Sequence, residues 1–246
     1  MIEALKLGKV FPGTKKRDKV LAVNDVSFRC EPGQIYGLLG ANGAGKTTTL
    51  RILATILRPT SGTAVVAGYD VNREPAKVRA HVGFLSTATA LYGRLTAQEM
   101  VEYFGRLYGL DEDRLHRDID QIFTTLEMND FRDRPCEKLS TGMKQKVSIA
   151  RTLIHDPPVM IFDEPTVGLD VMTARTIVSF IRHCRERGKT VIFSTHVMSE
   201  VEKLCDRIGI IHTGRILAEG SLAELRERYR EQDLEEIFVR VVGEGS

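Results

Sequence analysis

Short apolar runs that end in glycine or in carboxylates mark the strands of this chain. Residues 34–39 (QIYGLL) lead directly into a glycine-rich segment, and residues 159–164 (VMIFDE) end in two carboxylates. A third run, at 191–195 (VIFST), follows a helical stretch. Strands that alternate with helices in this way are typical of a parallel sheet. The pattern therefore predicts an α/β core.

The N-terminal segment follows a different period. Val26, Phe28 and Cys30 alternate with the polar residues Ser27 and Arg29. An alternation of period two is typical of a strand with one buried face. We expect a β-rich start to the chain.

Helical periodicity dominates the middle of the chain, between the first and the later strands. Apolar residues recur there at helical spacing, for example Ile119, Ile122, Phe123 and Leu126. This pattern predicts an inserted helical segment of about sixty residues, with uncertain edges.

Several smaller elements complete the prediction. Leu50, Leu53 and Leu57 predict a helix that continues to near Pro59. Two short runs, at 63–68 and 81–85, are candidate strands. The segment 207–220 predicts a closing hairpin with its turn at Thr213 and Gly214, and apolar positions after residue 220 predict one or two terminal helices.

Composition narrows the function without defining it. The 246 residues are 42% hydrophobic and 28% charged, with a net charge of +2, so we expect no nucleic-acid partner. No apolar stretch approaches the roughly 18 residues needed to cross a bilayer, and we expect no signal peptide. Any membrane role would then pass through another chain. The four cysteines are scattered and predict reduced thiols of a cytoplasmic protein.

The most specific motif lies between the first apolar strand and the helix that follows. Residues 40–47 (GANGAGKT) match G-x-x-x-x-G-K-T in the strand-to-helix context that this phosphate loop requires. Glycines let successive backbone N–H groups face phosphates, and the helix N-terminus adds partial positive charge. The predicted nucleotide-binding residues are Gly40, Asn42, Gly43, Gly45, Lys46, Thr47 and Thr48.

Two carboxylates at the end of a later strand complement this loop. Lys46 can contact the β- and γ-phosphates, and the hydroxyl of Thr47 can bind Mg²⁺. Asp163 would hold the hydration shell of the metal, as a Walker B aspartate does, and Glu164 is placed to orient or deprotonate an attacking water. By itself, an apolar run that ends in Asp-Glu is more often a strand end. Together with residues 40–47 it predicts Mg²⁺-dependent ATP hydrolysis.

Three further motifs give the chain a family resemblance. They are residues 139–145 (LSTGMKQ), 163–170 (DEPTVGLD) and 194–196 (STH). With the phosphate loop, their order and spacing resemble the ATP-binding subunit of ABC transporters over nearly the whole chain. The residues 233–242 (DLEEIFVRVV) and the segment around 84–96 are similar to sodium-export (NatA-like) and multidrug-export subunits.

The resemblance implies a fold and a dimer. The fold is α/β, a P-loop NTPase (RecA-like) core with an N-terminal antiparallel β subdomain and an inserted α-helical subdomain. A serine and a glycine at a helix start can bind an anion, and the resemblance implies that Ser140 and Gly142 bind the γ-phosphate of ATP held by a second copy. It places Asp170 at the seam of that dimer.

Two aromatic side chains take their roles from the resemblance alone. It implies that His196 contacts the γ-phosphate as a switch, and that Phe11 stacks on adenine. By default, a histidine after a buried strand is a structural residue and a lone phenylalanine at a strand end belongs to the core.

The chain departs from the family pattern at three positions. Thr141 and Met143 replace residues of the usual Leu-Ser-Gly-Gly-Gln, while the serine and the second glycine are kept. Thr87 stands where the family has a glutamine in the loop that senses the γ-phosphate, and we expect Thr87 to reach Mg²⁺ through a water. Gln98 is not a substitute, because Thr96 and Glu99 form a capping-box pattern that places Gln98 in the first turn of a helix.

The sequence thus predicts one ABC ATP-binding domain over residues 1–246. We expect an ATPase core with its β subdomain at 1–86 and 156–220, a helical subdomain at 87–155 and a C-terminal helical tail at 221–246. The expected function is ATP hydrolysis that powers export, of sodium or drugs for example, by a permease on a separate chain. The expected complex is a homodimer, or a heterodimer with a related ATPase, on the cytoplasmic face of the membrane.

Two other functions remain open at this point. One is a soluble ABC-type ATPase of translation or repair, although such proteins usually carry two cassettes or a long coiled-coil insertion. The other is a subunit that binds ATP without hydrolysing it, which commonly lacks the residue at Glu164 or the one at His196.

Overall fold

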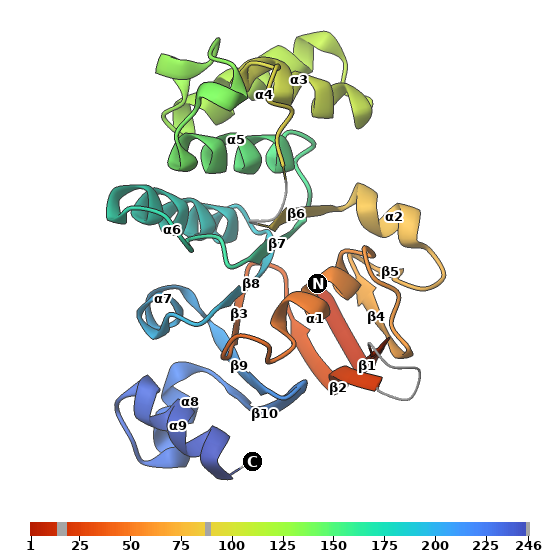
Figure 1. Ribbon diagram of the computed structural model, residues 1–246, viewed down its shortest axis with the longest axis vertical. Helices are drawn as coiled ribbons and strands as arrows, with labels where there is room; N and C mark the ends of the chain where they lie inside the picture. The colour runs from red at the N-terminus through yellow and green to blue at the C-terminus, as the bar shows by residue number, and fades with distance from the viewer. Residues whose placement is uncertain (14–18, 87–89, 245–246) are drawn as a thin grey trace.

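Two β-sheets and nine α-helices make up the part of the chain that the structure describes, residues 1–13, 19–86 and 90–244 of a computed structural model (Figure 1). The strands are β1 (Ile2–Pro12), β2 (Lys19–Cys30), β3 (Ile35–Leu39), β4 (Ser61–Val66), β5 (Tyr69–Asp70), β6 (Val82–Ser86), β7 (Val159–Asp163), β8 (Thr190–Thr195), β9 (Arg207–His212) and β10 (Arg215–Gly220). The helices are α1 (Lys46–Leu53), α2 (Pro75–Ala80), α3 (Ala97–Leu107), α4 (Glu112–Thr125), α5 (Thr141–Leu153), α6 (Val171–Glu186), α7 (Met198–Leu204), α8 (Leu222–Tyr229) and α9 (Leu234–Glu244).

The larger sheet is the predicted parallel core. Its strand order is β10-β9-β3-β8-β7-β6, and every neighbouring pair except β10 with β9 is parallel. Strands β3, β7 and β8 are buried along their whole length, as expected of parallel strands covered on both faces. Because β3, β7 and β8 are neighbours, the segments that follow them lie at one edge of the sheet.

The smaller sheet is antiparallel and forms the predicted N-terminal β subdomain. Its order is β2-β1-β4-β5, and alternate residues of β2 are buried from Val26 to Cys30. Side chains of α1 pack in one core with residues of β1, β2 and β4 and with residues of β3 and β7. Helix α1 therefore joins the two sheets.

The inserted helices α3, α4 and α5 gather at one end of the molecule, above β6 and α6, and we call them the helical lobe (Figure 1). Helix α3 begins with the predicted capping box, in which Thr96 and Glu99 bond each other's backbone. Gln98 lies in the first turn of α3 and pairs with Glu102 and Arg132. The predicted helical insert and the predicted place of Gln98 are confirmed.

At the opposite end of the molecule, α8 and α9 pack on the β9–β10 hairpin (Figure 1). The hairpin turn at Thr213 and Gly214 and the terminal helices are as predicted. Within the described residues, no helix is both long enough and apolar enough to cross a bilayer.

One predicted helix boundary is wrong. Helix α1 ends at Leu53 rather than near Pro59. Thr55 adopts a left-handed backbone with φ of 58°, and the N–H groups of Ile56 and Leu57 both donate to the carbonyl of Arg51. The apolar spacing of Leu57 continues past this turn because its side chain packs on the same core.

Candidate nucleotide-binding site

The predicted phosphate loop forms a cavity of about 260 Å³, which we call the phosphate cradle. It lies between the end of β3 and the start of α1, with residues from β2 and from the end of β7 in its wall. It is lined by Ala22, Asn42, Gly43, Gly45, Lys46, Thr47, Thr48 and Glu164. The structure thus brings most of the predicted nucleotide-binding residues together with the predicted catalytic carboxylate.

Close packing explains two of the glycines in the loop. A Cβ on Gly40 would lie 2.4 Å from the carbonyl oxygen of Ile211. Gly45 has φ of 104°, and its Cβ would lie 2.5 Å from the carbonyl oxygen of Ala22. Both neighbours are backbone atoms of strands or turns, so a side chain at either position would displace the loop.

Lys46 is held tightly within the cradle. Its side chain is only 4% exposed, and its Nζ donates to the carbonyls of Gly40 at 2.7 Å and Ala41 at 3.1 Å. The same Nζ lies 3.1 Å from Oε1 of Glu164. A buried ammonium at a helix N-terminus creates a site that attracts an anion.

Thr47, in the lining of the cradle, contacts Asp163 at the end of β7. The hydroxyl of Thr47 donates to Oδ1 of Asp163 at 2.9 Å, and Ser194 of β8 donates to the same oxygen at 2.8 Å. Among the described residues there is no cluster of three or more His, Cys, Asp and Glu side chains that could enclose a metal. A hydroxyl beside a single carboxylate is instead the donor set of a Mg²⁺ ion that takes its remaining ligands from phosphates and water.

His196 follows β8 and stands beside the catalytic candidate. Its Nδ1 lies 3.6 Å from Oε1 of Glu164, and its side chain is 44% exposed. Lys46 and His196 therefore both approach the same carboxylate oxygen of Glu164. The structure brings Glu164 and His196 together, and their catalytic roles stay predictions.

Ser140, Gly142 and Asp170 are not part of the cradle lining. The hydroxyl of Ser140 accepts a hydrogen bond from the N–H of Met143 and caps α5. Asp170 caps α6 and accepts bonds from Met172 and Thr173. The bonds from Thr173, followed by the bond from Met172, lower the pKa of Asp170.

Phe11 and Thr87 are the two remaining predictions. Phe11 pairs with Val20 in the β1–β2 ladder, two residues before the cradle residue Ala22, and Lys9 lies over its ring with Nζ 5.2 Å from the centroid. Thr87 falls outside the described residues, so its contact with Mg²⁺ stays a prediction.

Sequence reasoning missed three side chains that organise the site. Ser194 bonds Asp163 and the backbone of Glu164. Glu200 accepts hydrogen bonds from Thr166 at 2.6 Å and Thr195 at 2.8 Å. Gln145, on α5, donates to the carbonyl of Pro165 at 3.0 Å. Ser194 and Gln145 lie within motifs that the sequence did display, but nothing in the spacing reveals their partners.

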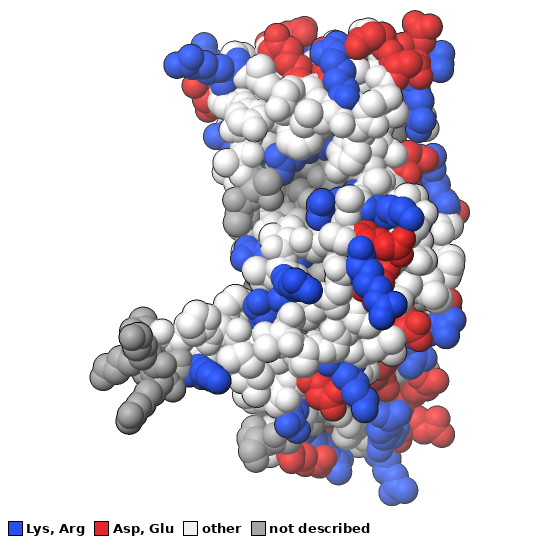
Figure 2. Space-filling model, turned by 90° about the vertical axis from the view of Figure 1, so that its right-hand side faces the viewer, with Lys and Arg blue, Asp and Glu red and all other residues white. Residues whose placement is uncertain are grey.

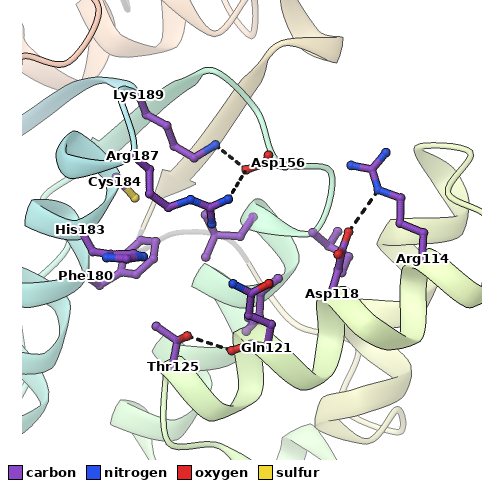
Figure 3. A pocket seen from close by; sticks show the side chains of 13 residues that line it. Arg114, Asp118, Gln121, Thr125, Asp156, Phe180, His183, Cys184, Arg187 and Lys189 are labelled. Atoms are coloured by element: carbon purple, nitrogen blue, oxygen red, sulfur yellow. Dashed lines mark hydrogen bonds and ion pairs between the residues drawn. The ribbon is translucent and has the colours of Figure 1, made fainter.

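We call the contact between the helical lobe and the rest of the molecule, including α6 and the larger sheet, the lobe junction. A second cavity, of about 120 Å³, lies at this junction between α4 and α6 (Figure 3). Asp156 follows α5 and is held by Lys189 at 2.6 Å and Arg187 at 3.9 Å, while Arg114 and Asp118 pair on α4. Lys189 and Arg187, which follow α6, pair with Asp156 in the segment after α5, while Arg114 pairs within α4 (Figure 3). Each of these three cations therefore already has a carboxylate partner on the protein.

A groove of about 310 Å³ lies on another side of the lobe junction. Its wall includes Phe84 of β6, Phe104 and Tyr108 at the end of α3, and Arg151 and His155 at the end of α5. Figure 2 shows the side of the molecule that carries α2, where the surface is hollowed below the helical lobe and charges of both signs surround uncharged atoms.

Comparison with known proteins agrees with this geometry. A family model described as ABC transporter matches residues 23–167. The chain is 44% identical over 225 residues to the ABC transporter ATP-binding protein NatA of Bacillus subtilis (strain 168), across 91% of this chain and 92% of NatA. It is 36% identical over 214 residues to the linearmycin resistance ATP-binding protein LnrL of the same organism, across 87% of this chain and 69% of LnrL.

A solved structure extends the comparison to the fold. The dimeric post-hydrolysis state of the ATP-binding cassette MJ0796, bound to ADP and Pi, matches with a TM-score of 0.81 and 26% identity. The match covers 90% of this chain and 98% of the cassette. That cassette is thus a dimer that holds the products of ATP hydrolysis.

Proposed function

The chain belongs to the ABC transporter family of ATP-binding ATPases, and we propose that it powers export through a membrane-spanning permease carried on a separate chain. The resistance named for LnrL supports export as the direction of transport. Sodium and drugs are the candidate cargoes. The permease would hold the chain at the cytoplasmic face of the membrane.

One observation supports the proposal above all: Lys46, Thr47 and Glu164 line a single cradle, and Asp163 accepts a hydrogen bond from Thr47. Lys46 and the loop N–H groups would bind the β- and γ-phosphates. Thr47 and Asp163 would hold Mg²⁺, which when bound neutralises charge on the phosphates. The residues present fit that ion, because a hydroxyl and one carboxylate already face each other at 2.9 Å.

Glu164 would act as the general base. It orients a water and accepts its proton at a carboxylate oxygen as the water attacks the γ-phosphate. The ammonium of Lys46, now 3.1 Å from Oε1, would turn toward phosphate oxygens when nucleotide binds. His196, 3.6 Å from the same oxygen, would contact the γ-phosphate as well as the carboxylate.

A second copy would complete the site. Ser140 and Gly142 lie at the N-terminus of α5, outside the cradle of their own chain, and are proposed to bind ATP held by a homodimer partner or a related ATPase. Beside Asp170, Val171 and Met172 are 68% and 70% exposed. Exposed apolar side chains at this point support burial in a dimer, as does the dimeric form of the similar cassette.

The permease is proposed to dock on the groove at the lobe junction. Its rim carries exposed apolar side chains, including Ile56 at 55% and Tyr108 at 43%. Tyr92, which is 58% exposed, packs edge-on against Tyr103 nearby on α3. An apolar groove with an aromatic rim suits an amphipathic helix of a partner.

The division of the chain follows the same scheme. We propose a core with its β subdomain at 1–86 and 156–220, a helical subdomain at 87–155 and a tail at 221–246. Together they form one ATP-binding domain, with Phe11 as the adenine platform.

The experiment is to purify the chain with the membrane protein that accompanies it and to measure phosphate release. Glu164→Gln should lower kcat by about 100-fold or more, since a positioned general base contributes on this scale. Glu235→Gln, on the exposed side of α9, is the matched control and should leave kcat unchanged. Chelation of Mg²⁺ should stop hydrolysis, and added MgCl₂ should restore it.

Two outcomes would contradict the proposal. Equal hydrolysis by wild type and Glu164→Gln would remove Glu164 from the mechanism. Full ATPase activity with no accompanying membrane chain, and no stimulation by membranes, would favour the soluble ATPase instead.

A further inference from the structure

The catalytic candidate Glu164 has an unusual backbone. Its φ is 49°, in the left-handed region that L residues other than Asn and Asp rarely adopt. Strained backbone of this kind persists only where the surroundings hold it, and it gathers at functional sites. The contacts that hold Glu164 therefore decide where its carboxylate points.

The contacts on the N-terminal side come from the parallel sheet. The N–H of Glu164 donates to the carbonyl of Ser194 at 3.2 Å and to its Oγ at 3.1 Å. The same hydroxyl donates to Asp163 at 2.8 Å. Ser194 is fully buried on β8, so this anchor is part of the rigid core.

On the C-terminal side, the carbonyl of Glu164 accepts a local bond from the N–H of Val167 at 3.3 Å, and a further contact comes from the helical lobe. Pro165 is buried and has no N–H, and its carbonyl accepts a hydrogen bond from Nε2 of Gln145 at 3.0 Å. Gln145 lies on α5, five residues after Ser140. The backbone around Glu164 is thus tied to the core on one side and to α5 on the other.

Close packing keeps α5 within reach of this loop. Gln145 follows Gly142 by three residues, so both occupy one face of the helix. A Cβ on Gly142 would lie 2.8 Å from Oγ1 of Thr173 on α6. The glycine lets the first turn of α5 approach α6, and Gln145 can then reach Pro165.

We propose that Gln145 is a positioning residue for ATP hydrolysis: its side-chain amide fixes the backbone next to Glu164 and so orients the catalytic carboxylate. Ser140, the N-cap of the same helix, is proposed to contact ATP on the partner. One hydrogen bond therefore links α5 to the backbone beside Glu164, the base that acts on the chain's own ATP. The inference rests on the proposed role of Glu164.

Two substitutions remove the donor in different ways. Gln145→Glu keeps the length of the side chain but places an acceptor against the Pro165 carbonyl, and Gln145→Leu removes hydrogen bonding without adding charge. The matched controls are Gln121→Glu and Gln121→Leu, on the exposed face of α4 in the same lobe. All four are measured for kcat and KM of ATP hydrolysis and for the melting temperature.

We expect the Gln145 substitutions to lower kcat without changing KM or the melting temperature. Both Gln145 variants should lower kcat by about tenfold, because a misplaced catalytic group costs rate on this scale or more. KM for ATP and the melting temperature should stay close to wild type, and both controls should behave as wild type. A role in stability alone would lower the melting temperature and leave kcat unchanged.

Combination with Glu164→Gln provides the sharper test. If Gln145 acts through Glu164, Gln145→Leu should cause no further loss of single-turnover rate in the Glu164→Gln background. A full tenfold loss in that background, or a wild-type kcat of the single variants, would overturn the inference. The proposed function fails separately, if Glu164→Gln alone keeps the wild-type rate.

Discussion

The phosphate cradle and the lobe junction are built in different ways. In the cradle, Lys46 and Asp163 are buried and each makes several short polar contacts. At the lobe junction, apolar side chains of α3, α4 and α5 share one buried core with β6, β7, β8 and α6, next to a cavity of about 120 Å³ and a groove of about 310 Å³. The cradle is therefore fixed by directional polar contacts, whereas the helical lobe is held mainly by apolar packing, to which the hydrogen bond of Gln145 to Pro165 adds a directional contact.

A pair of matched glycine substitutions tests this contrast most strongly. Gly40→Ala in the cradle would place a Cβ against the carbonyl oxygen of Ile211, which is fixed because it belongs to strand β9. The substitution should lower the free energy of unfolding by about 2–3 kcal/mol. Gly142→Ala at the junction meets only the short side chain of Thr173 and gains helix propensity, so its cost should be under about 1 kcal/mol. Urea unfolding measures both.

A second substitution serves as the control for this pair. Thr173→Ala removes the two atoms nearest to the added Cβ but also the hydrogen bond from Thr173 to Asp170, so the comparison is made within the Thr173→Ala background, where adding Gly142→Ala should cost no further stability. The cost of Gly40→Ala should be the same with and without Thr173→Ala. Equal losses at the two glycines would mean that the junction is packed as rigidly as the cradle.

An ion pair at the junction gives a smaller expected effect. Asp156 has φ of 50° and is paired with Lys189, whose side chain is 8% exposed (Figure 3). The substitution Asp156→Asn is compatible with the left-handed backbone, because asparagine adopts it readily, but it removes the negative charge that faces the ammonium of Lys189. It should cost about 1 kcal/mol in urea unfolding, less than a fully buried pair because Asp156 itself is half-exposed.

Asp118→Asn is the matched control in the same cavity. Its partner Arg114 is 47% exposed, so solvent screens the pair and the loss should be within about 0.3 kcal/mol. A loss of stability as large as that of Asp156→Asn would show that solvent screens neither the Arg114–Asp118 pair nor the Lys189–Asp156 pair effectively.

The contrast also explains which features the sequence could predict. The phosphate loop, Asp163 and the capping box at Thr96 depend on spacing within a few residues, so local pattern was enough to place them. Asp163 ends β7, and Thr47 lies in the first turn of α1, which follows β3; the two residues meet because β3 and β7 end at the same edge of one parallel sheet, with β8 between them. The fold class and the helical insert followed from the same periodicity.

Other features depend on contacts between distant segments. The bond from Gln145 to Pro165 spans 20 residues and two lobes, and the one from Ser194 to Asp163 spans 31. The left-handed backbone of Glu164 arises because these neighbours hold it, and a glutamate in a sequence carries no sign of it. The early end of α1 at Leu53 is similar, since the left-handed turn at Thr55 interrupts a spacing that continues to look helical.

His155, in the groove at the lobe junction, allows a test of stability by pH. Its ring stacks on Tyr108 with centroids 3.7 Å apart, and within the described residues neither ring nitrogen has a hydrogen-bond partner. Burial lowers the pKa of His155 from 6.5 to about 4. The native state therefore binds fewer protons than the unfolded state between pH 4 and pH 6.5, and stability falls as the pH drops through this window.

The expected loss is about 1 kcal/mol between pH 7 and pH 5, after allowance for partial exposure of the ring. His155→Phe keeps an aromatic ring against Tyr108 and removes the titration, so its unfolding free energy should fall less than that of the wild type over the same interval. His116→Phe, which removes an exposed imidazole from α4, should retain the wild-type slope. Equal slopes for wild type and His155→Phe would mean that the imidazole finds solvent or a partner when it is protonated. The groove at the lobe junction would then be open enough to hydrate a charge, in contrast to the cradle, where the buried Lys46 depends on fixed protein atoms.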